Sequence, residues 1–432
     1  MARLIPVTMI APAVVVAASF LFAPLSQFLL HLKVLGFTRL FRSIENIHGE
    51  NLRIIPDTQF TEDLHYHTPS GLLFGASESD HKTRNTWFPP LTIWEEPDLI
   101  GQGGIVVIDT KTTSCTRLAL YNFDGPFNTH GIDIYLPPDD PTIVYIVAVN
   151  HLPNPEYYDR STSAKNLTIP KARSRLELFY HKIGTSEATH IRSIWHPLIR
   201  TPNDVLIKSM NEIYVTNDHY HREGSMRLIE ALAWGDFAPW TDLIHLYIEN
   251  PLSEVVNDTA GVTGTAAIEG LQTNNGLGYG RSLSEIMIVR AHAGKLLLAA
   301  VDEANPPKLR IDESIQLHST LDNPSYFSDP YAAKTGRDAS GYVLAGMARA
   351  IAFPNGLDPA MVWLVQPSSA SEKGGQKRTR KLIFQDDGHV MRTASTAVLV
   401  AIDPDTNDGK KQAHLYVTGP LARGIVVSKI DL

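Results

Sequence analysis

Four pairs of acidic and amide residues are the part of this chain best suited to chemistry. They are Glu62-Asp63, Asn203-Asp204, Asn274-Asn275 and Asp322-Asn323. Carboxylate and carboxamide oxygens are hard ligands, the type that calcium takes in preference to softer donors. Because the pairs are spread along most of the chain, they can share a site only if the fold brings many segments to a common centre. A β-propeller has this property.

Strand geometry indicates how the pairs could work. Adjacent residues of an extended segment point to opposite sides, so the two members of a pair would serve different neighbours. Two divalent ions stacked along a central channel would use both members. The first ion could take Glu62, Asn203, Asn275, Asp322 and Asn323, and the second could take Asp63, Asp204 and a backbone carbonyl near Ile132. Each set carries two negative charges, which match one Ca²⁺. Any one pair alone is an ordinary turn dipeptide.

Composition excludes several other classes of site. The chain has 432 residues and a formal net charge of −8, so no nucleic-acid partner is expected. Cys115 is the only cysteine, which rules out an intrachain disulfide and a thiolate zinc cluster. No His-x-x-x-His pattern is visible either, so a zinc hydrolase fits poorly.

The N-terminus differs from the rest of the chain. No charge occurs from Leu4 to Leu25, which is long enough to span a bilayer as a helix. Arg3 before this run and Ala17-Ala18-Ser19 within it also suit a secretory signal. We expect residues 1–40 to be a hydrophobic leader or anchor, and the protein to be secreted or membrane-anchored. Two sequons, at Asn166 and Asn257, are compatible with a glycoprotein.

Residues 41–432 read as a single all-β domain. Short apolar or alternating runs are separated by turn residues, which is typical of a sandwich, barrel or propeller. The runs are Gly71–Ala76, Gly104–Ile108, Ile143–Val149, Leu176–Tyr180, Glu212–Val215, Leu243–Ile248, Glu285–Val289, Lys295–Ala300, Gly341–Ala345, Met361–Val365, Lys381–Phe384, Ala397–Ile402, His414–Val417 and Gly424–Lys429. Asn154–Arg175 and Pro367–Arg380 are expected to be solvated loops.

One segment breaks the β pattern. Residues Met226 to Trp234 are good helix formers with few β-branched side chains. Two interpretations stay open: an amphipathic helix over the mouth of a propeller or at a membrane surface, or an ordinary helix packed on the core.

Several motifs add a family resemblance. They are Thr61-Glu62-Asp63-Leu64, Phe127-Asn128-Thr129-His130-Gly131-Ile132, Val149-Asn150-His151, Pro202-Asn203-Asp204-Val205, Thr216-Asn217-Asp218-His219-Tyr220, Asn275-Gly276-Leu277 and Leu321-Asp322-Asn323. With these motifs in this order, the chain resembles the serum paraoxonase/arylesterase family of calcium-dependent lactonases. The resemblance covers nearly the whole chain.

The resemblance implies a six-bladed β-propeller whose central tunnel holds two calcium ions. The catalytic ion would bind Glu62, Asn203, Asn275, Asp322 and Asn323, and the structural ion would bind Asp63, Asp204 and the Ile132 carbonyl. His130 matches the family's proposed general base and His151 its supporting partner. The Met226–Trp234 helix matches a helix that helps members of the family bind to lipid surfaces.

The implied function is calcium-dependent hydrolysis of small lipophilic lactones and aryl esters. The calcium would polarise the carbonyl, and His130 would take a proton from the attacking water. The alternative is a calcium-stabilised propeller that binds a partner without hydrolase activity, because a fold does not fix an activity.

The chain departs from the family in two places. Members generally join their N- and C-terminal parts by a disulfide, which a single cysteine cannot form. Closure must then depend on strand pairing, and we place Gly424–Lys429 beside an N-terminal strand; loss of the crosslink costs roughly 2–5 kcal/mol. The stretch Ala345–Ala350 also differs, which puts the substrate preference in doubt.

Overall fold

A computed structural model describes residues 25–78, 81–159, 169–234, 236–253, 257–353, 356–367 and 378–432. The uncharged run ahead of Leu25 and the sequon at Asn166 lie outside the described residues. The sequon at Asn257 lies on an exposed turn, where the Asn257 Oδ1 accepts hydrogen bonds from the backbone and hydroxyl of Thr259.

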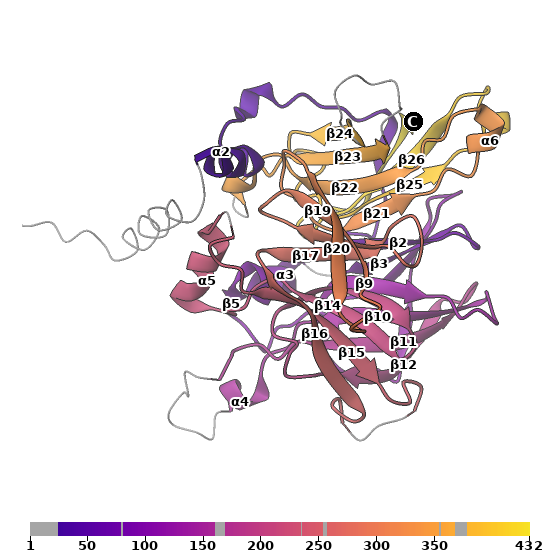
Figure 1. The fold of residues 1–432 in the computed structure, drawn as a ribbon. Helices are drawn as coiled ribbons and strands as arrows, with labels where there is room; N and C mark the ends of the chain where they lie inside the picture. The colour runs from indigo at the N-terminus through magenta and orange to yellow at the C-terminus, as the bar shows by residue number, and fades with distance from the viewer. Residues whose placement is uncertain are drawn as a thin grey trace, which may run out of the picture.

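Six antiparallel sheets surround one axis, which confirms the six-bladed β-propeller (Figure 1). The first sheet contains β2 (Asp63–His67), β3 (Leu72–Ser77), β6 (Gly104–Asp109) and β7 (Cys115–Arg117). The second contains β9 (Thr129–Tyr135), β10 (Ile143–Asn150), β11 (Arg175–Lys182) and β12 (Glu187–Ile194), with β8 (Ala119–Tyr121) parallel to β12. The third contains β13 (Pro202–Ser209), β14 (Glu212–Asn217), β15 (Thr241–Ile248) and β16 (Val262–Leu271).

The other three sheets follow in chain order. The fourth contains β17 (Asn274–Tyr279), β18 (Ile286–Arg290), β19 (Lys295–Val301) and β20 (Leu309–Gln316). The fifth contains β21 (Pro324–Phe327), β22 (Gly341–Met347), β23 (Ala360–Pro367) and β24 (Arg378–Asp386). The sixth combines β25 (Ala397–Ala401), β26 (Gln412–Val417) and β27 (Val426–Asp431) with β1 (Glu50–Ile54). A two-stranded sheet of β4 (Trp87–Phe88) and β5 (Ile93–Trp94) lies apart from the blades.

The composition of each strand matches its place in its blade. Second strands such as β3 and β14 are apolar and buried because neighbouring blades cover both of their faces. Fourth strands such as β20 are mostly exposed or half-buried, with only Leu309 and Ile315 of β20 buried. A hydrophobic cluster lies between each neighbouring pair of sheets, so six clusters hold the ring together.

The ring is closed without a crosslink. Strand β1 pairs antiparallel with β27, with Glu50 opposite Lys429 and Ile54 opposite Val426. The backbone amide of Ile55 extends the pairing by donating to the Ile425 carbonyl over 2.8 Å. The pairing expected near the C-terminus is therefore present. It joins the N-terminal strand β1 to the C-terminal strand β27 within the sixth sheet, without a disulfide.

Helices gather mainly at one end of the tunnel. They are α2 (Leu25–Val34), α3 (His81–Thr86), α4 (Pro155–Tyr158), α5 (Gly224–Leu232) and α6 (Ala332–Thr335), with 3₁₀ turns at Phe41–Ser43, Pro89–Leu91, Ala350–Ala352 and Pro404–Thr406. In Figure 1, α2, α3 and α5 lie on the left of the sheets and α6 on the right. Within the described ranges, every helix is too short or too polar to cross a membrane.

The Met226–Trp234 segment is helical as predicted, but its polarity is reversed relative to a core helix. In α5 the charged residues Arg227 and Glu230 are buried, whereas Met226, Leu228 and Leu232 are 37–46% exposed. The two Glu230 carboxylate oxygens accept hydrogen bonds from two backbone amides of the preceding turn. The helix therefore uses polar contacts to hold its place and presents its apolar side outward.

One loop prediction is partly wrong. Arg378, Thr379 and Arg380 were expected in a solvated loop, but they begin β24 and pair with the end of β23. Arg378 also forms a 2.8 Å ion pair with Glu313 of β20. The neighbouring blade supplies a carboxylate that local sequence could not reveal.

Candidate metal centre and active site

The innermost strand of each blade begins at the tunnel, and the predicted residues lie at these strand starts. Glu62 directly precedes β2 and Asp63 begins it. Asn203 and Asp204 follow Pro202, the first residue of β13. Asn274-Asn275 opens β17, and Asp322-Asn323 comes directly before β21. His130 to Ile132 lies near the start of β9. Strand starts separated by long stretches of sequence thereby become neighbours around one axis.

Two glycines allow these strands to approach closely. A Cβ atom on Gly131 would lie 2.5 Å from the Asn203 carbonyl oxygen and 2.6 Å from Asp204 Oδ1. A Cβ atom on Gly276 would lie 2.4 Å from the Asn323 Cα atom. Any larger residue would separate the strands that carry the oxygen donors. This explains why glycine occurs in both the His-Gly-Ile and Asn-Gly-Leu motifs.

The first predicted set forms a buried group of oxygen donors. Glu62 is 2% exposed, and its Oε1 accepts a hydrogen bond from Asn323 Nδ2 over 3.0 Å. Glu62, Asn203, Asn275 and Asp322 line one cavity. Among the described residues, four buried side-chain oxygens of this set find no hydrogen-bond partner, namely Glu62 Oε2, Asn275 Oδ1, Asp322 Oδ1 and Asn323 Oδ1. Such unsatisfied acceptors are rare in folded proteins, and a hard divalent cation would satisfy all four.

The raised pKa values of the buried carboxyl groups also favour a bound cation at this site. Burial raises the pKa of Glu62 well above its usual value, and the charges of Asp322 and Asp63 raise it further. Burial and the charge of Asp63 likewise raise the pKa values of Asp322 and Asp204. Carboxyl groups placed this closely repel one another when ionised, and a bound cation would reverse these shifts. In the described part of the chain, no three His, Cys, Asp or Glu side chains share one metal position, so the set depends on its amides.

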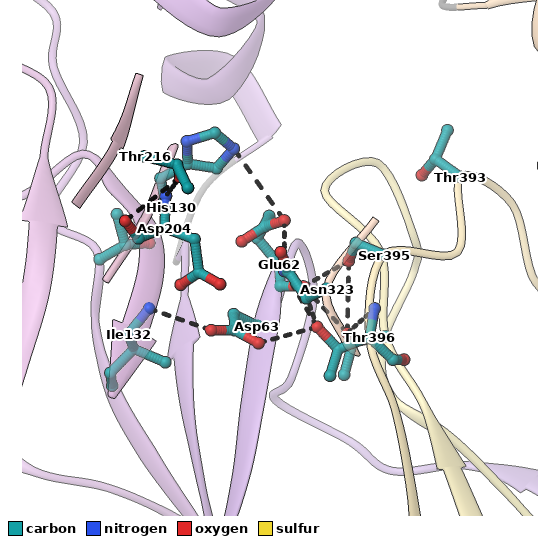
Figure 2. Close-up of polar contacts among 12 residues, drawn as sticks. Glu62, Asp63, His130, Ile132, Asp204, Thr216, Asn323, Thr393, Ser395 and Thr396 are labelled. Carbon is teal, nitrogen blue, oxygen red and sulfur yellow. Dashed lines mark hydrogen bonds and ion pairs between the residues drawn. The ribbon is translucent and has the colours of Figure 1, made fainter. Parts of the chain in front are cut away.

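The second predicted set lies deeper in the tunnel (Figure 2). Asp63 Oδ2 accepts a hydrogen bond from the Ile132 amide over 3.1 Å, and Asp204 Oδ2 accepts one from the Leu277 amide over 2.6 Å. Each residue of an extended strand points its N–H and its C=O toward the same edge of the strand. The Ile132 carbonyl therefore lies on the edge that meets Asp63. Asp63, Asp204 and Ile132 are thus brought together, and the second ion stays a prediction.

His65 is an unpredicted cation beside this set. Its Nε2 is 3.1 Å from Asp63 Oδ2, and its Nδ1 is 3.3 Å from Asp133 Oδ1. Burial disfavours its charged form, but the two carboxylates outweigh this effect and raise the pKa of His65 to about 9. The same contacts keep the pKa of Asp63 below its usual value although the residue is buried.

The two predicted histidines form a hydrogen-bonded pair at the cavity floor. His151 Nε2 lies 3.1 Å from His130 Nδ1, and His151 Nδ1 lies 2.8 Å from Ser174 Oγ. The Nε2 atom of His130 faces Glu62 Oε1 at 4.0 Å. Burial lowers the pKa of His130 to about 4, and burial together with the charge of His130 lowers the pKa of His151 well below its usual value. Both rings are therefore neutral near pH 7.

A cavity of about 450 Å³ opens above this centre. Its polar floor contains His130, Glu62 and Asp322, and most of its wall is apolar. The wall includes Gly346, Met347 and Ala350 from the stretch that differs from the family pattern. It also includes Leu35 and Phe37 after α2, and Ala231 and Leu232 from α5. The volume and polarity suit a small lipophilic molecule.

Sequence reasoning missed the contribution of the sixth blade. Ser395 and Thr396 come directly before β25 and occupy the place that acid and amide pairs occupy in other blades. The Thr396 hydroxyl donates to Asp63 Oδ1 over 2.8 Å, and the hydroxyls of Ser395 and Thr418 donate to the Glu62 carbonyl. The signal in the sequence was a polar pair directly before an apolar run, here Ala397–Ile402.

Comparison with known proteins gives a consistent set of relatives, although no family model matches the sequence. Serum paraoxonase/arylesterase 2 of Rattus norvegicus is 26% identical over 203 residues, which are 45% of this chain and 49% of that protein. The Bos taurus protein of the same name is 23% identical over 305 residues, or 68% of this chain and 71% of that protein. Human serum paraoxonase/lactonase 3 is 26% identical over 196 residues, or 44% and 47%. The matched segment thus spans about half of the rat and human relatives.

Solved structures are more distant. A putative gluconolactonase superposes with a TM-score of 0.43 at 12% identity and covers 90% of this chain and 94% of its own. The calcium-binding protein regucalcin of Agrobacterium tumefaciens superposes with a TM-score of 0.42 at 9% identity and covers 90% and 97%. These scores are too low to say anything about function.

The fold and the site together define a six-bladed β-propeller with a buried centre of oxygen donors and a histidine pair at one mouth of its tunnel. In sequence, the chain is similar to the serum paraoxonases.

Proposed function

We propose that this chain is a calcium-dependent hydrolase of lactones and aryl esters, with His130 as the general base. Two calcium ions would be held in the tunnel. The first would be bound by the first predicted set, Glu62, Asn203, Asn275, Asp322 and Asn323, and the second by Asp63, Asp204 and the Ile132 carbonyl. The observation that carries the proposal is the group of four unpartnered oxygens beneath an apolar cavity, with a neutral imidazole beside them.

The first set would provide the electrophilic half of the reaction. A calcium ion bound there would polarise a substrate carbonyl and favour negative charge on its oxygen. Glu62 and Asp322 neutralise the ion, and the amides of Asn203, Asn275 and Asn323 complete the donor set without adding charge. The chain itself therefore supplies a fixed, buried group of donors that does not need to reorganise during the reaction.

The histidine pair would provide the base. Because His130 is neutral, its Nε2 can accept a proton from water held in the cavity. His130 Nδ1 can donate to His151 Nε2, and His151 Nδ1 can in turn donate to Ser174 Oγ, which fixes the tautomer with the free electron pair on Nε2. The negative charge of Asp218 favours the imidazolium that forms.

The apolar wall would select the substrate. Leu91, Leu232, Met347 and Phe353 surround the polar floor, so a small lipophilic lactone or ester fits better than a charged one. We also propose that the mouth rests on a lipid surface. Leu25 and Leu29 of α2 and the apolar side of α5 are exposed at the same mouth, and Phe28 of α2 contacts Trp234 after α5 with ring centroids 4.8 Å apart.

The test is hydrolysis of phenyl acetate and a δ-lactone by the full chain, with and without EDTA. We expect activity that EDTA abolishes and calcium restores. The variant His130→Gln should lose turnover and keep calcium binding. If the protein binds calcium but hydrolyses neither substrate, the propeller is a calcium-stabilised binding module and the hydrolase proposal fails.

A further inference from the structure

A segment of the first blade reaches across the tunnel mouth to the histidine pair. Between β3 and β6, the chain leaves the sheet and forms α3, β4, a 3₁₀ turn and β5. The segment is anchored to the second blade, because Asn128 Nδ2 donates to the Trp87 carbonyl over 2.9 Å. It is also closed on itself, since the Glu96 amide donates to the Thr86 carbonyl and Trp87 packs edge-on against Trp94. We name residues 81–103 the mouth segment.

The mouth segment places one aromatic ring against both imidazoles. Phe88 is 1% exposed, with ring centroids 5.4 Å from His130 and 5.8 Å from His151. The ring planes are nearly perpendicular to both imidazoles, at 80° and 84°. Edge-to-face contacts of this kind are directional. The His130–His151 hydrogen bond leaves each imidazole free to rotate about the line of that bond, and the contact with Phe88 restricts this rotation.

Arg84 holds Phe88 and the backbone next to His130 together. Its guanidinium carbon lies 4.0 Å from the centre of the Phe88 ring. The same guanidinium donates to the Thr129 carbonyl over 3.2 Å, directly before His130 in the chain. Arg84 is fully buried, so its position is set by these contacts and not by solvent. The ring, the imidazole and the strand are therefore one packed unit.

We propose that Phe88 is a positioning residue for the His130–His151 pair, presented by the mouth segment and supported by Arg84. This inference rests on the proposed function. Phe88 has no polar atom and takes no part in proton transfer. It keeps the Nε2 atom of His130 aimed into the cavity and covers the side of the pair from which water would otherwise compete for the His130–His151 hydrogen bond.

Two variants of one residue and a matched control test this role. Phe88→Leu keeps an apolar side chain but removes the ring, and Phe88→Ala removes nearly all of the side chain. Leu91→Ala is the control, because Leu91 lies in the same segment and lines the same cavity but has no aromatic ring to pack against an imidazole. We expect both Phe88 variants to lower kcat between about tenfold and a hundredfold, in addition to any rise in KM that follows because Phe88 also lines the cavity. Leu91→Ala should mainly raise KM.

A readout independent of activity separates this idea from the proposed function. The proton shared by His130 and His151 should give a slowly exchanging imidazole N–H signal in proton NMR, assigned by its absence in His151→Phe. We expect the signal to be lost in Phe88→Leu and retained in Leu91→Ala, with calcium binding unchanged in both. If Phe88→Ala does not fold, Phe88→Leu carries the test. A Phe88→Leu protein that keeps the signal, or keeps kcat within twofold, overturns the positioning role, whereas a wild-type protein with the signal and no hydrolysis overturns only the proposed function.

Discussion

The close approach of the inner strands at Gly131 can be tested by adding one carbon atom. Gly131 has an ordinary backbone conformation, so Gly131→Ala introduces no backbone strain and only the volume of a Cβ atom. That atom would lie 2.5 Å from the Asn203 carbonyl oxygen, whereas ordinary contact begins at 3.4 Å. Strands β9 and β13 must therefore separate by about 0.9 Å at the level of Asn203 and Asp204.

The expected consequences follow from the size of this displacement. Overpacking of this kind destabilises a protein by about 1–3 kcal/mol. A misplacement near 1 Å at a catalytic centre lowers turnover by about a hundredfold. Because Asn203 and Asp204 belong to different donor sets, we expect calcium affinity to fall at least tenfold, or about 1.4 kcal/mol in binding free energy.

Calorimetric calcium titration, thermal unfolding and lactone hydrolysis would measure these three effects. Gly125→Ala is the control, because the nearest atom to its added Cβ would be Arg175 Nη2 at 3.9 Å. Gly276→Ala should reproduce the defect, since its Cβ would lie 2.4 Å from the Asn323 Cα atom. If Gly131→Ala binds calcium and unfolds like Gly125→Ala, the strands do not pack around the donors as described.

Three further predictions concern charge. Asp322→Asn keeps the size of the side chain but removes one negative charge, so calcium affinity should fall at least tenfold in a calorimetric titration while circular dichroism stays unchanged. In EDTA the pKa of His65, raised to about 9, means that the folded protein binds more protons than the unfolded chain between about pH 6.5 and pH 9, and the raised pKa values of Glu62 and Asp204 act in the same direction; the melting temperature should therefore fall as pH rises through this range, and a rise would contradict the buried centre. Burial lowers the pKa of His31 to about 4, so protonation between about pH 6.5 and pH 4 should weaken the docking of α2, and the fluorescence of Trp234, which His31 stacks against, should change over that range.

Local sequence was sufficient for the middle of each blade. The apolar runs Gly104–Ile108 and Ile143–Val149, for example, are parts of β6 and β10. Such strands are covered on both faces, so their composition reports their conformation directly. The innermost strands were recognised only as polar pairs, because β2 and β13 begin with polar residues where other strands begin with core residues.

The residue types of the site could also be predicted from the sequence. Carboxylates, amides and a His-Gly-Ile motif indicate oxygen ligands and a base before any coordinates are known. The sequence did not reveal that Thr396 holds Asp63 in place, or that His65 lies between two carboxylates. Serine, threonine and histidine have many ordinary uses in a chain, so their types alone do not indicate a role.

By itself, the sequence determined an all-β chain with hard oxygen donors and an apolar helix-forming segment. Only the tertiary structure decided that the donors form one buried group, that Phe88 lies against both histidines, and that α5 turns its apolar side outward. The physical reason is the difference in sequence separation between the interactions involved. Strand and helix patterns arise from neighbours a few residues apart, whereas the site is made by contacts between blades, which depend on how six sheets pack around a common axis.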